Sequence, residues 1–206
     1  MIHLAVLLGL VLLFALVLEH IFGLLENAGF DKIDAFAILI LPPAVELIIH
    51  PIHVATYDNL NIYADIAGFV VPLFISAKLI ASGRVPALKA VIGIALLAYV
   101  CNKNAVVGHF GVGITDLVTP IIVASLYSLY ASDRPAPLAY VSGSVGMIIG
   151  ADILNIPRLS AFSSKFITVG GAGMFDAIYV VGIFAVFLDI LISWTSRFKE
   201  SFKKLT

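Results

Sequence analysis

The chain has 206 residues, of which 61% are hydrophobic and only 12% are charged, and its mean hydropathy is +1.10. Soluble domains carry about 25% charged residues, so this composition excludes a soluble globular domain and predicts an integral membrane protein. The net charge of −1 offers no basic surface for nucleic acid, and the single cysteine, Cys101, excludes a disulfide within these residues.

Seven apolar stretches predict an all-α fold, a polytopic transmembrane helical bundle of about seven spans that forms one membrane domain over residues 1–206. The first stretch is interpreted as a retained helix, because it is longer than the apolar part of a signal peptide and lacks a basic start. A bundle of six spans, with one weak segment merged or dropped, is the alternative. The predicted spans are 3–25, 35–50, 62–82, 87–102, 111–130, 136–154 and 170–193.

Proline and glycine predict that two regions of the chain are broken helices. Pro42 and Pro43 lie inside the second span, which is expected to bend or unwind there. Residues 156–175 combine Pro157 with a glycine cluster at Gly170, Gly171 and Gly173, and each glycine costs a helix about 1 kcal/mol relative to alanine. We therefore predict a loop or a re-entrant segment that presents backbone groups toward Asp176.

The lysine and arginine residues predict how the chain is oriented in the membrane. With the C-terminus in the cytoplasm and the N-terminus outside, nine of them fall on the inside and three on the outside. This bias favours that orientation in the plasma membrane, which we expect to be prokaryotic. The tail 197–204 is either a basic anchor to anionic headgroups or a simple stop-transfer flank.

Acidic residues in or beside the spans are the strongest functional signal, because an ionisable group in hydrocarbon is costly. Asp31 and Asp34 fall in a loop and are expected to be solvated. Seven other acidic residues lie in or at the edges of the predicted spans: Glu19, Glu46, Asp65, Asp116, Asp152, Asp176 and Asp189.

Four of these aspartates lie toward the outer side in the predicted orientation, each near glycine or proline. Transporters build ion sites from broken helices of this kind, although small residues also serve close helix packing. The candidate cation or proton site therefore contains Asp152, Asn155, Asp176, Asp65 and Asp116.

The histidines leave two alternatives open. His50 and His53 are three residues apart, a spacing that metal sites use, but the intervening Pro51 argues against one helix face. Hydrogen bonding at the membrane interface is the other interpretation. No cofactor is evident from the sequence, and a bound cation is allowed by it.

Several sequence blocks resemble a known family. The blocks are 139–143, 150–155 with Pro157 and Arg158, and 170–176, with earlier matches over 62–76 and 111–124. Together they resemble the prokaryotic membrane family named domain of unknown function 1614. This resemblance implies a multi-span membrane fold and emphasises Asp152, Asn155 and Asp176, but it implies no reaction.

Three functions remain open. The first is transport or conduction coupled to a cation or proton. The second is an aspartate-dependent membrane hydrolase in which Asp152 and Asp176 act as base and acid on a shared water. Intramembrane aspartyl proteases carry Gly-x-Gly-Asp, whereas here two residues separate Gly173 from Asp176. The third is a structural or accessory membrane protein. The lipid bilayer is the expected partner, the substrate is open, and an oligomer is compatible with the sequence.

Overall fold

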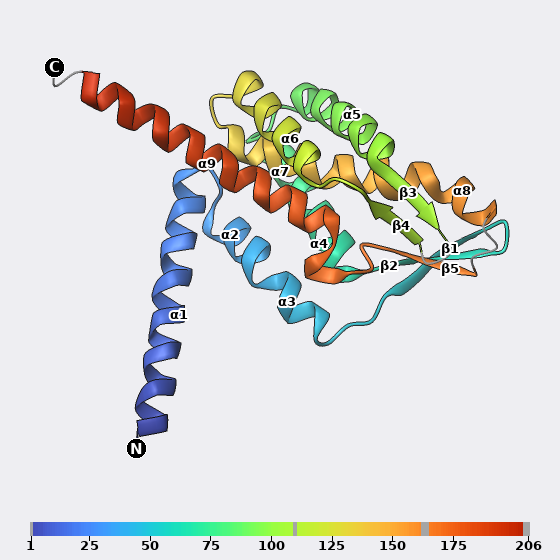
Figure 1. Ribbon diagram of the computed structural model, residues 1–206, viewed down its shortest axis with the longest axis horizontal. Coiled ribbons are helices and arrows are strands. Elements are labelled where there is room, and N and C mark those ends of the chain that lie inside the picture. Colours follow the sequence, from blue (N-terminus) through green and yellow to red (C-terminus); the bar gives the residue numbers. More distant parts are fainter. Residues whose placement is uncertain (1, 109–110, 162–164, 204–206) are drawn as a thin grey trace.

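The computed structural model describes residues 2–108, 111–161 and 165–203, and it is mostly helical, with 72% of residues in helices (Figure 1). The α-helices are α1 (Ile2–Asn27), α2 (Lys32–Leu39), α3 (Leu41–Glu46), α4 (Val71–Ala81), α5 (Ala87–Asn104), α6 (Val118–Ala131), α7 (Pro135–Met147), α8 (Ile156–Ala161) and α9 (Ala177–Lys203). Two π-helical turns, η1 (Ile66–Val70) and η2 (Ile148–Asp152), and two 3-10 turns, η3 (Ile153–Asn155) and η4 (Gly173–Phe175), connect them.

Helix α7 forms the centre of the bundle. It packs against α4, α5, α6 and α9, and 72% of the apolar stretch that begins with it is buried. Small residues permit this packing: a Cβ atom added at Gly146 would lie 3.2 Å from the backbone nitrogen of Ala98 in α5. The α7 helix is therefore surrounded by protein, as the central helix of a membrane bundle must be when its neighbours face the lipid.

Helix α1 stands apart from this bundle. Figure 1 shows it projecting from the body of the protein, joined only at its C-terminal end. Its 22-residue apolar stretch, Val6–Asn27, is long enough to cross a membrane. Residues 6–17 are exposed along their whole length, and the buried residue near the C-terminal end of the helix is Leu25. Water would be a poor solvent for a helix that is apolar on all sides, and lipid is a good one.

Within the described residues, four helices are long and apolar enough to cross a membrane. They are Val6–Asn27, Ala87–Asn104, Pro135–Ala161 and Ala177–Thr195; the helices Ile66–Ala81 and Val118–Ala131 are apolar but shorter. The chain is thus a helical membrane protein, but the seven predicted spans are not confirmed. The shortfall arises because three predicted spans contain turns, breaks or strands rather than one continuous helix.

The predicted break in the second span is confirmed. Helix α2 ends at Leu39 and α3 begins at Leu41, with Pro42 and Pro43 in the first turn of α3. Proline is tolerated there because the first turn of a helix has no internal partner for its N–H groups. The two short helices together replace the single span expected over 35–50.

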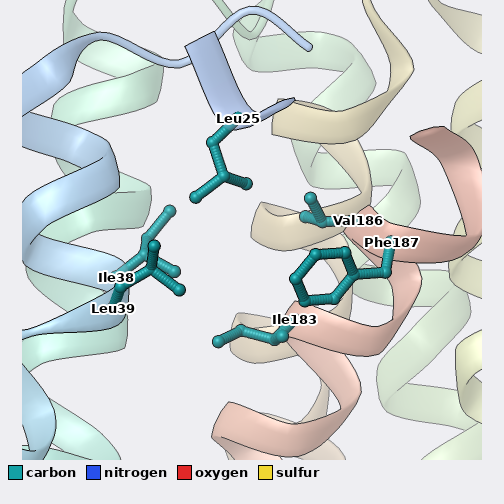
Figure 2. A pocket seen from close by; sticks show the side chains of 6 residues that line it. All are labelled: Leu25, Ile38, Leu39, Ile183, Val186 and Phe187. Atoms are coloured by element: carbon teal, nitrogen blue, oxygen red, sulfur yellow. The ribbon is translucent and has the colours of Figure 1, made fainter. Parts of the chain in front are cut away.

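Helix α2 is held against α9 by apolar packing. Figure 2 shows Ile38 and Leu39 of α2 and Leu25 of α1 facing Ile183, Val186 and Phe187 of α9. The space between these side chains leaves about 0 Å³ for a water molecule, so it is a packing contact and not a ligand site. The Tyr179 hydroxyl of α9 also donates a hydrogen bond to the backbone carbonyl of Ile38.

Five short strands correct the all-α prediction. Strands β1 (Ile52–Tyr57) and β2 (Leu60–Ala64) form an antiparallel hairpin, and β5 (Phe166–Val169) pairs with β2 in parallel. The hairpin turn contains Asp58 and Asn59 with φ of 46° and 66°, a conformation that short hairpins favour. Strands β3 (Ala105–Gly108) and β4 (Gly111–Ile114) form a second antiparallel pair.

The strands occupy positions where helix was predicted. Strand β2 takes the start of the third predicted span, and β4 takes the start of the fifth. Leu60, Ile62 and Ala64 face the protein interior, whereas β1 is exposed along its whole length. The strands gather at one end of the molecule, near α8 (Figure 1).

Candidate functional site

Two aspartates lie at the ends of the two π-helical turns. Asp65 immediately precedes η1, and its Oδ1 accepts a hydrogen bond of 2.7 Å from the backbone N–H of Gly68. Asp152 is the last residue of η2. Turns of this kind are rare and occur frequently at functional sites, because the extra residue leaves backbone groups outside the regular helical pattern.

The glycine cluster forms a tight turn between these two aspartates. Gly170 and Gly173 have φ of 72° and 58°, which side chains other than glycine rarely adopt. Gly170 lies so close to η1 that an added Cβ atom would be 2.7 Å from the backbone nitrogen of Phe69. This turn follows β5, so the prediction that residues 156–175 are not one continuous helix is confirmed.

The glycine turn supplies hydrogen-bond donors to two carboxylates. The backbone N–H of Gly170 donates to Asp152, and that of Ala172 donates to Asp176 over 3.3 Å. Asp176 also accepts a bond of 2.9 Å from the N–H of Ile178, so it caps the start of α9. The expected backbone groups are therefore aimed at Asp176, and Asp152 receives one as well.

The structure brings Asp65, Asp152 and Asp176 together at the end of the bundle that carries the strands. The charge of Asp176 acts on Asp152, and the charge of Asp65 acts on Asp176. We call these three residues the carboxylate chain. Asp176 occupies its middle position, between the residues that adjoin the two π-helical turns.

Glu46, the last residue of α3, belongs beside this chain. A Cβ atom added at Gly173 would overlap the Glu46 carboxyl group, which therefore lies directly against the glycine turn. The sequence analysis places Glu46 among the acidic residues of the spans but not in the candidate site. The signal that could have included it is the proline break of its own helix, which aims the end of α3 toward the turn.

Asn155 has a different role from the aspartates. Its fully buried Nδ2 donates to the backbone carbonyls of Gly150 and Ala151, at 3.1 and 2.8 Å. Asn102 of α5 donates to the same Gly150 carbonyl at 3.1 Å. Both amides thereby satisfy carbonyl groups of η2 and fix the turn that carries Asp152. Sequence reasoning missed Asn102, because nothing in the sequence distinguishes it from Asn104 two residues later in the same helix.

Arg158 supports Asn155 rather than bridging the two aspartates. Its Nη1 donates a hydrogen bond of 2.9 Å to the Asn155 Oδ1. This contact leaves the Asn155 amide nitrogen oriented toward the η2 carbonyls.

Asp116 is not part of the carboxylate chain. It is half-buried, and its carboxylate accepts hydrogen bonds from the backbone N–H of Val118 at 2.8 Å and from the N–H and hydroxyl groups of Thr119. The hydroxyl bond of Thr119 is the main reason that the pKa of Asp116 lies below its ordinary value. These local bonds make Asp116 a cap at the start of α6.

The histidine pair lies in the exposed segment around β1. His53 is 3.2 Å from the Thr56 hydroxyl and packs edge-on against Tyr63. Within the part of the chain that the structure describes, no three histidine, cysteine or acidic side chains are placed to hold a metal ion together. The local contacts of His53 are those of a surface hydrogen bond on a strand.

An ion-pair network occupies the region of the α2 start and the α4 end. Asp34 is 1% exposed and pairs with Lys78 at 2.6 Å and with Arg84, and both cations also reach Asp31. The expectation that Asp31 and Asp34 are solvated is therefore wrong. A sequence separation of about fifty residues hid these partners, which only the packing of α2 on α4 brings together.

The contacts of Asp31 change its acidity. Burial raises the pKa of this carboxyl group, but the backbone N–H of Asp34 and the side chains of Arg84 and Lys78 outweigh burial and hold the pKa well below its ordinary 3.8. Asp31 and Asp34 also complete a reciprocal capping box at the start of α2. The network thus fixes the entry to α2.

Comparison with known proteins identifies a family but no characterised relative. Neither curated proteins nor solved structures give a match to this chain. A family model described as "Protein of unknown function (DUF1614)" matches residues 26–188, a region that includes the ion-pair network, both π-helical turns and the carboxylate chain. By this match over most of its length, the chain belongs to the DUF1614 family.

Proposed function

We propose that this protein carries protons through the membrane or couples their movement to a solute, with Asp152 as the proton-carrying group and Asp176 as the neighbouring carboxylate to which the proton passes. The observation that carries the proposal is the carboxylate chain, in which the charges of Asp65, Asp176 and Asp152 act on one another beside a glycine turn and two π-helical turns. Ionisable residues at broken membrane helices are typical of proton and ion pathways.

The hydrogen bonds assign different roles to the two central aspartates. Asp176 uses Oδ1 to accept from Ile178 and Oδ2 to accept from Ala172, so both of its oxygens have backbone donors. Such bonds favour the ionised form of a carboxylate, but burial outweighs them and raises the pKa of Asp176 overall. Asp152 has one backbone donor, Gly170, and a negative charge on Asp176 opposes its ionisation.

The same geometry favours a proton over a multivalent cation. A cation such as Ca²⁺ needs several oxygen ligands around one centre. Within the described residues, no group of three acidic, histidine or cysteine side chains is arranged around a common point. A proton needs only one carboxylate and a neighbour to which it can pass.

A membrane hydrolase is the second candidate, because the charge of Asp176 acts on Asp152 and two neighbouring carboxyl groups can serve as acid and base. In that reaction one carboxyl group must release a proton and the other must accept one. The spacing of Gly173 and Asp176, which departs from the Gly-x-Gly-Asp of intramembrane aspartyl proteases, favours the proton-pathway proposal over this alternative.

The test is proton flux in vesicles. The purified parent and its variants are reconstituted with a pH-sensitive dye inside, and a membrane potential is imposed. We expect flux in the parent, a loss of about tenfold or more in Asp152→Asn and Asp176→Asn, and unchanged flux in Asp116→Asn, a matched carboxylate outside the chain. A folded parent without flux refutes the proposal. Peptide cleavage that Asp152→Asn abolishes identifies the hydrolase instead, and neither activity favours a structural or accessory role.

The orientation in the membrane is part of the proposal. We infer that the carboxylate chain faces outward and that the ion-pair network of Asp31, Asp34, Lys78 and Arg84 faces the cytoplasm. The excess of lysine and arginine on that side supports it. Single cysteines at positions 104 and 197, in a Cys101→Ser background, are labelled with an impermeant reagent from each side. Labelling of both from one side refutes this orientation.

A further inference from the structure

A cavity lies where the end of α1, the start of α7 and the middle of α9 meet. It has a volume of about 500 Å³, which falls within the range of about 300–1,000 Å³ that is typical of small-molecule sites. Its wall contains Asn27 of α1, Asp133 and Arg134 just before α7, and Ser193 and Trp194 of α9. Three segments that are far apart in the sequence thus border a space that is large enough for a ligand.

The cavity lies at the level where the apolar stretches of α1 and α9 end. These stretches are Val6–Asn27 and Ala177–Thr195, and residues at the ends of both line the cavity. Trp194 is 66% exposed, and tryptophan is enriched where the hydrocarbon of a membrane meets its headgroups. A phospholipid headgroup is therefore the ligand that the membrane brings to this cavity.

The wall carries one positive and one negative side chain that a ligand can meet. Asp133 and Arg134 are exposed, and in the part of the chain that the structure describes neither side chain forms a hydrogen bond or an ion pair. The stem of Arg134 packs beside Gly29, where an added Cβ atom would be 3.5 Å from the Arg134 Cδ. Asp189 also lines the cavity, but its carboxylate already accepts hydrogen bonds from two serine hydroxyls of α6.

Two helix ends add to the polarity of the wall. The N-terminal end of a helix carries a partial positive charge and the C-terminal end a partial negative charge. Helix α7 begins at Pro135, directly after Arg134, and α1 ends at Asn27. The cavity therefore borders one helix end that favours an anion and another that favours a cation.

These groups select a zwitterionic headgroup with a primary ammonium. A guanidinium group binds phosphate through paired hydrogen bonds, so Arg134 suits the phosphate of a lipid. A primary ammonium can donate hydrogen bonds to the Asp133 carboxylate and to the Asn27 side-chain oxygen, whereas the quaternary ammonium of choline has no hydrogen to donate. The headgroup of phosphatidylglycerol carries the phosphate but no cation for Asp133.

We infer that this cavity binds the headgroup of phosphatidylethanolamine, with the phosphate on Arg134 and the ammonium on Asp133 and Asn27. The site shares no residue with the carboxylate chain and does not rest on the proposed proton pathway. Residues 6–17 of α1 are apolar and exposed, so the acyl chains of the same lipid can lie along them. In this arrangement the lipid links α1 to the bundle, which Figure 1 shows it joining only at its C-terminal end.

The experiment measures equilibrium binding of tritiated phosphatidylethanolamine to the purified full-length protein in detergent micelles. We expect saturable binding to a single site. At equal mole fractions in the micelles, unlabelled phosphatidylethanolamine is expected to compete at least about tenfold better than phosphatidylcholine or phosphatidylglycerol, because each of these lacks the primary ammonium. Soluble glycerophosphoethanolamine, which has the headgroup without acyl chains, is expected to compete weakly. Competition as strong as that of the lipid would indicate a soluble ligand and overturn the inference.

Two variants separate the roles of the two charges. Arg134→Gln is expected to weaken binding of both phosphatidylethanolamine and phosphatidylglycerol about tenfold or more, because both headgroups carry the phosphate. Asp133→Asn is expected to weaken phosphatidylethanolamine by a similar factor and to leave phosphatidylglycerol unchanged. The matched control is Lys89→Gln, which removes an exposed cation at the start of α5, outside the cavity wall.

Thermal unfolding checks that each variant is folded, and the lipid competition on the parent carries the test if one is not. Three results would overturn the inference. The first is the absence of saturable binding in the folded parent, and the second is equal competition by the three lipids. The third is folded Arg134→Gln or Asp133→Asn that binds phosphatidylethanolamine as tightly as Lys89→Gln does.

Discussion

Substituting Gly68 by alanine tests whether the close contact between η1 and the glycine turn holds the carboxylate chain in place. Gly68 lies in η1, and its backbone conformation is one that alanine can adopt. Its added Cβ atom would be 2.8 Å from the Gly173 carbonyl oxygen and 3.0 Å from the Gly170 carbonyl carbon. Both neighbours are backbone atoms, so no side-chain rotation can relieve the overlap.

The expected cost follows from two opposing effects. Overpacking a filled site costs about 1–3 kcal/mol. Alanine favours helical backbone over glycine by about 1 kcal/mol, which offsets part of that cost. We therefore expect the free energy of unfolding of Gly68→Ala to fall by up to about 2 kcal/mol. We also expect proton flux to fall about tenfold, because the displaced turn moves the donors of Gly170 and Ala172 away from their carboxylates.

Gly23→Ala is the matched control. Gly23 lies in α1, where an added Cβ atom meets nothing within 4 Å. The helix effect acts there alone, so the control is expected to be neutral or more stable by up to about 1 kcal/mol. Thermal unfolding in detergent and dye-based flux in vesicles are measured for both variants. A Gly68→Ala protein as stable and as active as Gly23→Ala would refute the reasoning.

Three further predictions concern stability and capping. Asn155→Ala should lower the free energy of unfolding by about 1–3 kcal/mol, because it leaves η2 carbonyls without a buried partner; Asn102→Ala, which removes a single such bond, should cost less in the same melts. The stability difference between the parent and Asp31→Asn should be constant at neutral pH and should shrink as the pH falls below 3.8. The reason is that the pKa of Asp31 is lowered in the folded state, so the unfolded state takes up the proton first. A difference that stays level down to about pH 2 in acid titrations would contradict this prediction. Asp116→Asn should shorten the helical start of α6 without changing flux, so a loss of flux similar to that of Asp152→Asn would contradict its role as a cap.

Hydropathy and backbone chemistry are the properties that could be read from the sequence. The membrane class, the lone first helix, the break at Pro42 and Pro43 and the interruption at Gly170–Gly173 depend on composition or on local conformational limits. The hairpin also had a local signal, the Asp58-Asn59 pair between β-branched and aromatic residues. This signal was concealed because apolar strands of this kind have the same composition as part of a membrane span.

Only the tertiary structure decided which polar groups meet. Lys78 and Arg84 pair with Asp34 because α2 packs on α4, and Ser125 and Ser128 meet Asp189 because α6 packs on α9. Asp116 and Asp176 look alike in sequence, since each has glycine before it at the start of a helix. Asp116 bonds only to the start of its own helix, and Asp176 is in the carboxylate chain. The cost of burying a charge follows from the residue type alone. The partner that offsets this cost comes from a distant segment, and only the packed fold brings that segment within hydrogen-bonding distance.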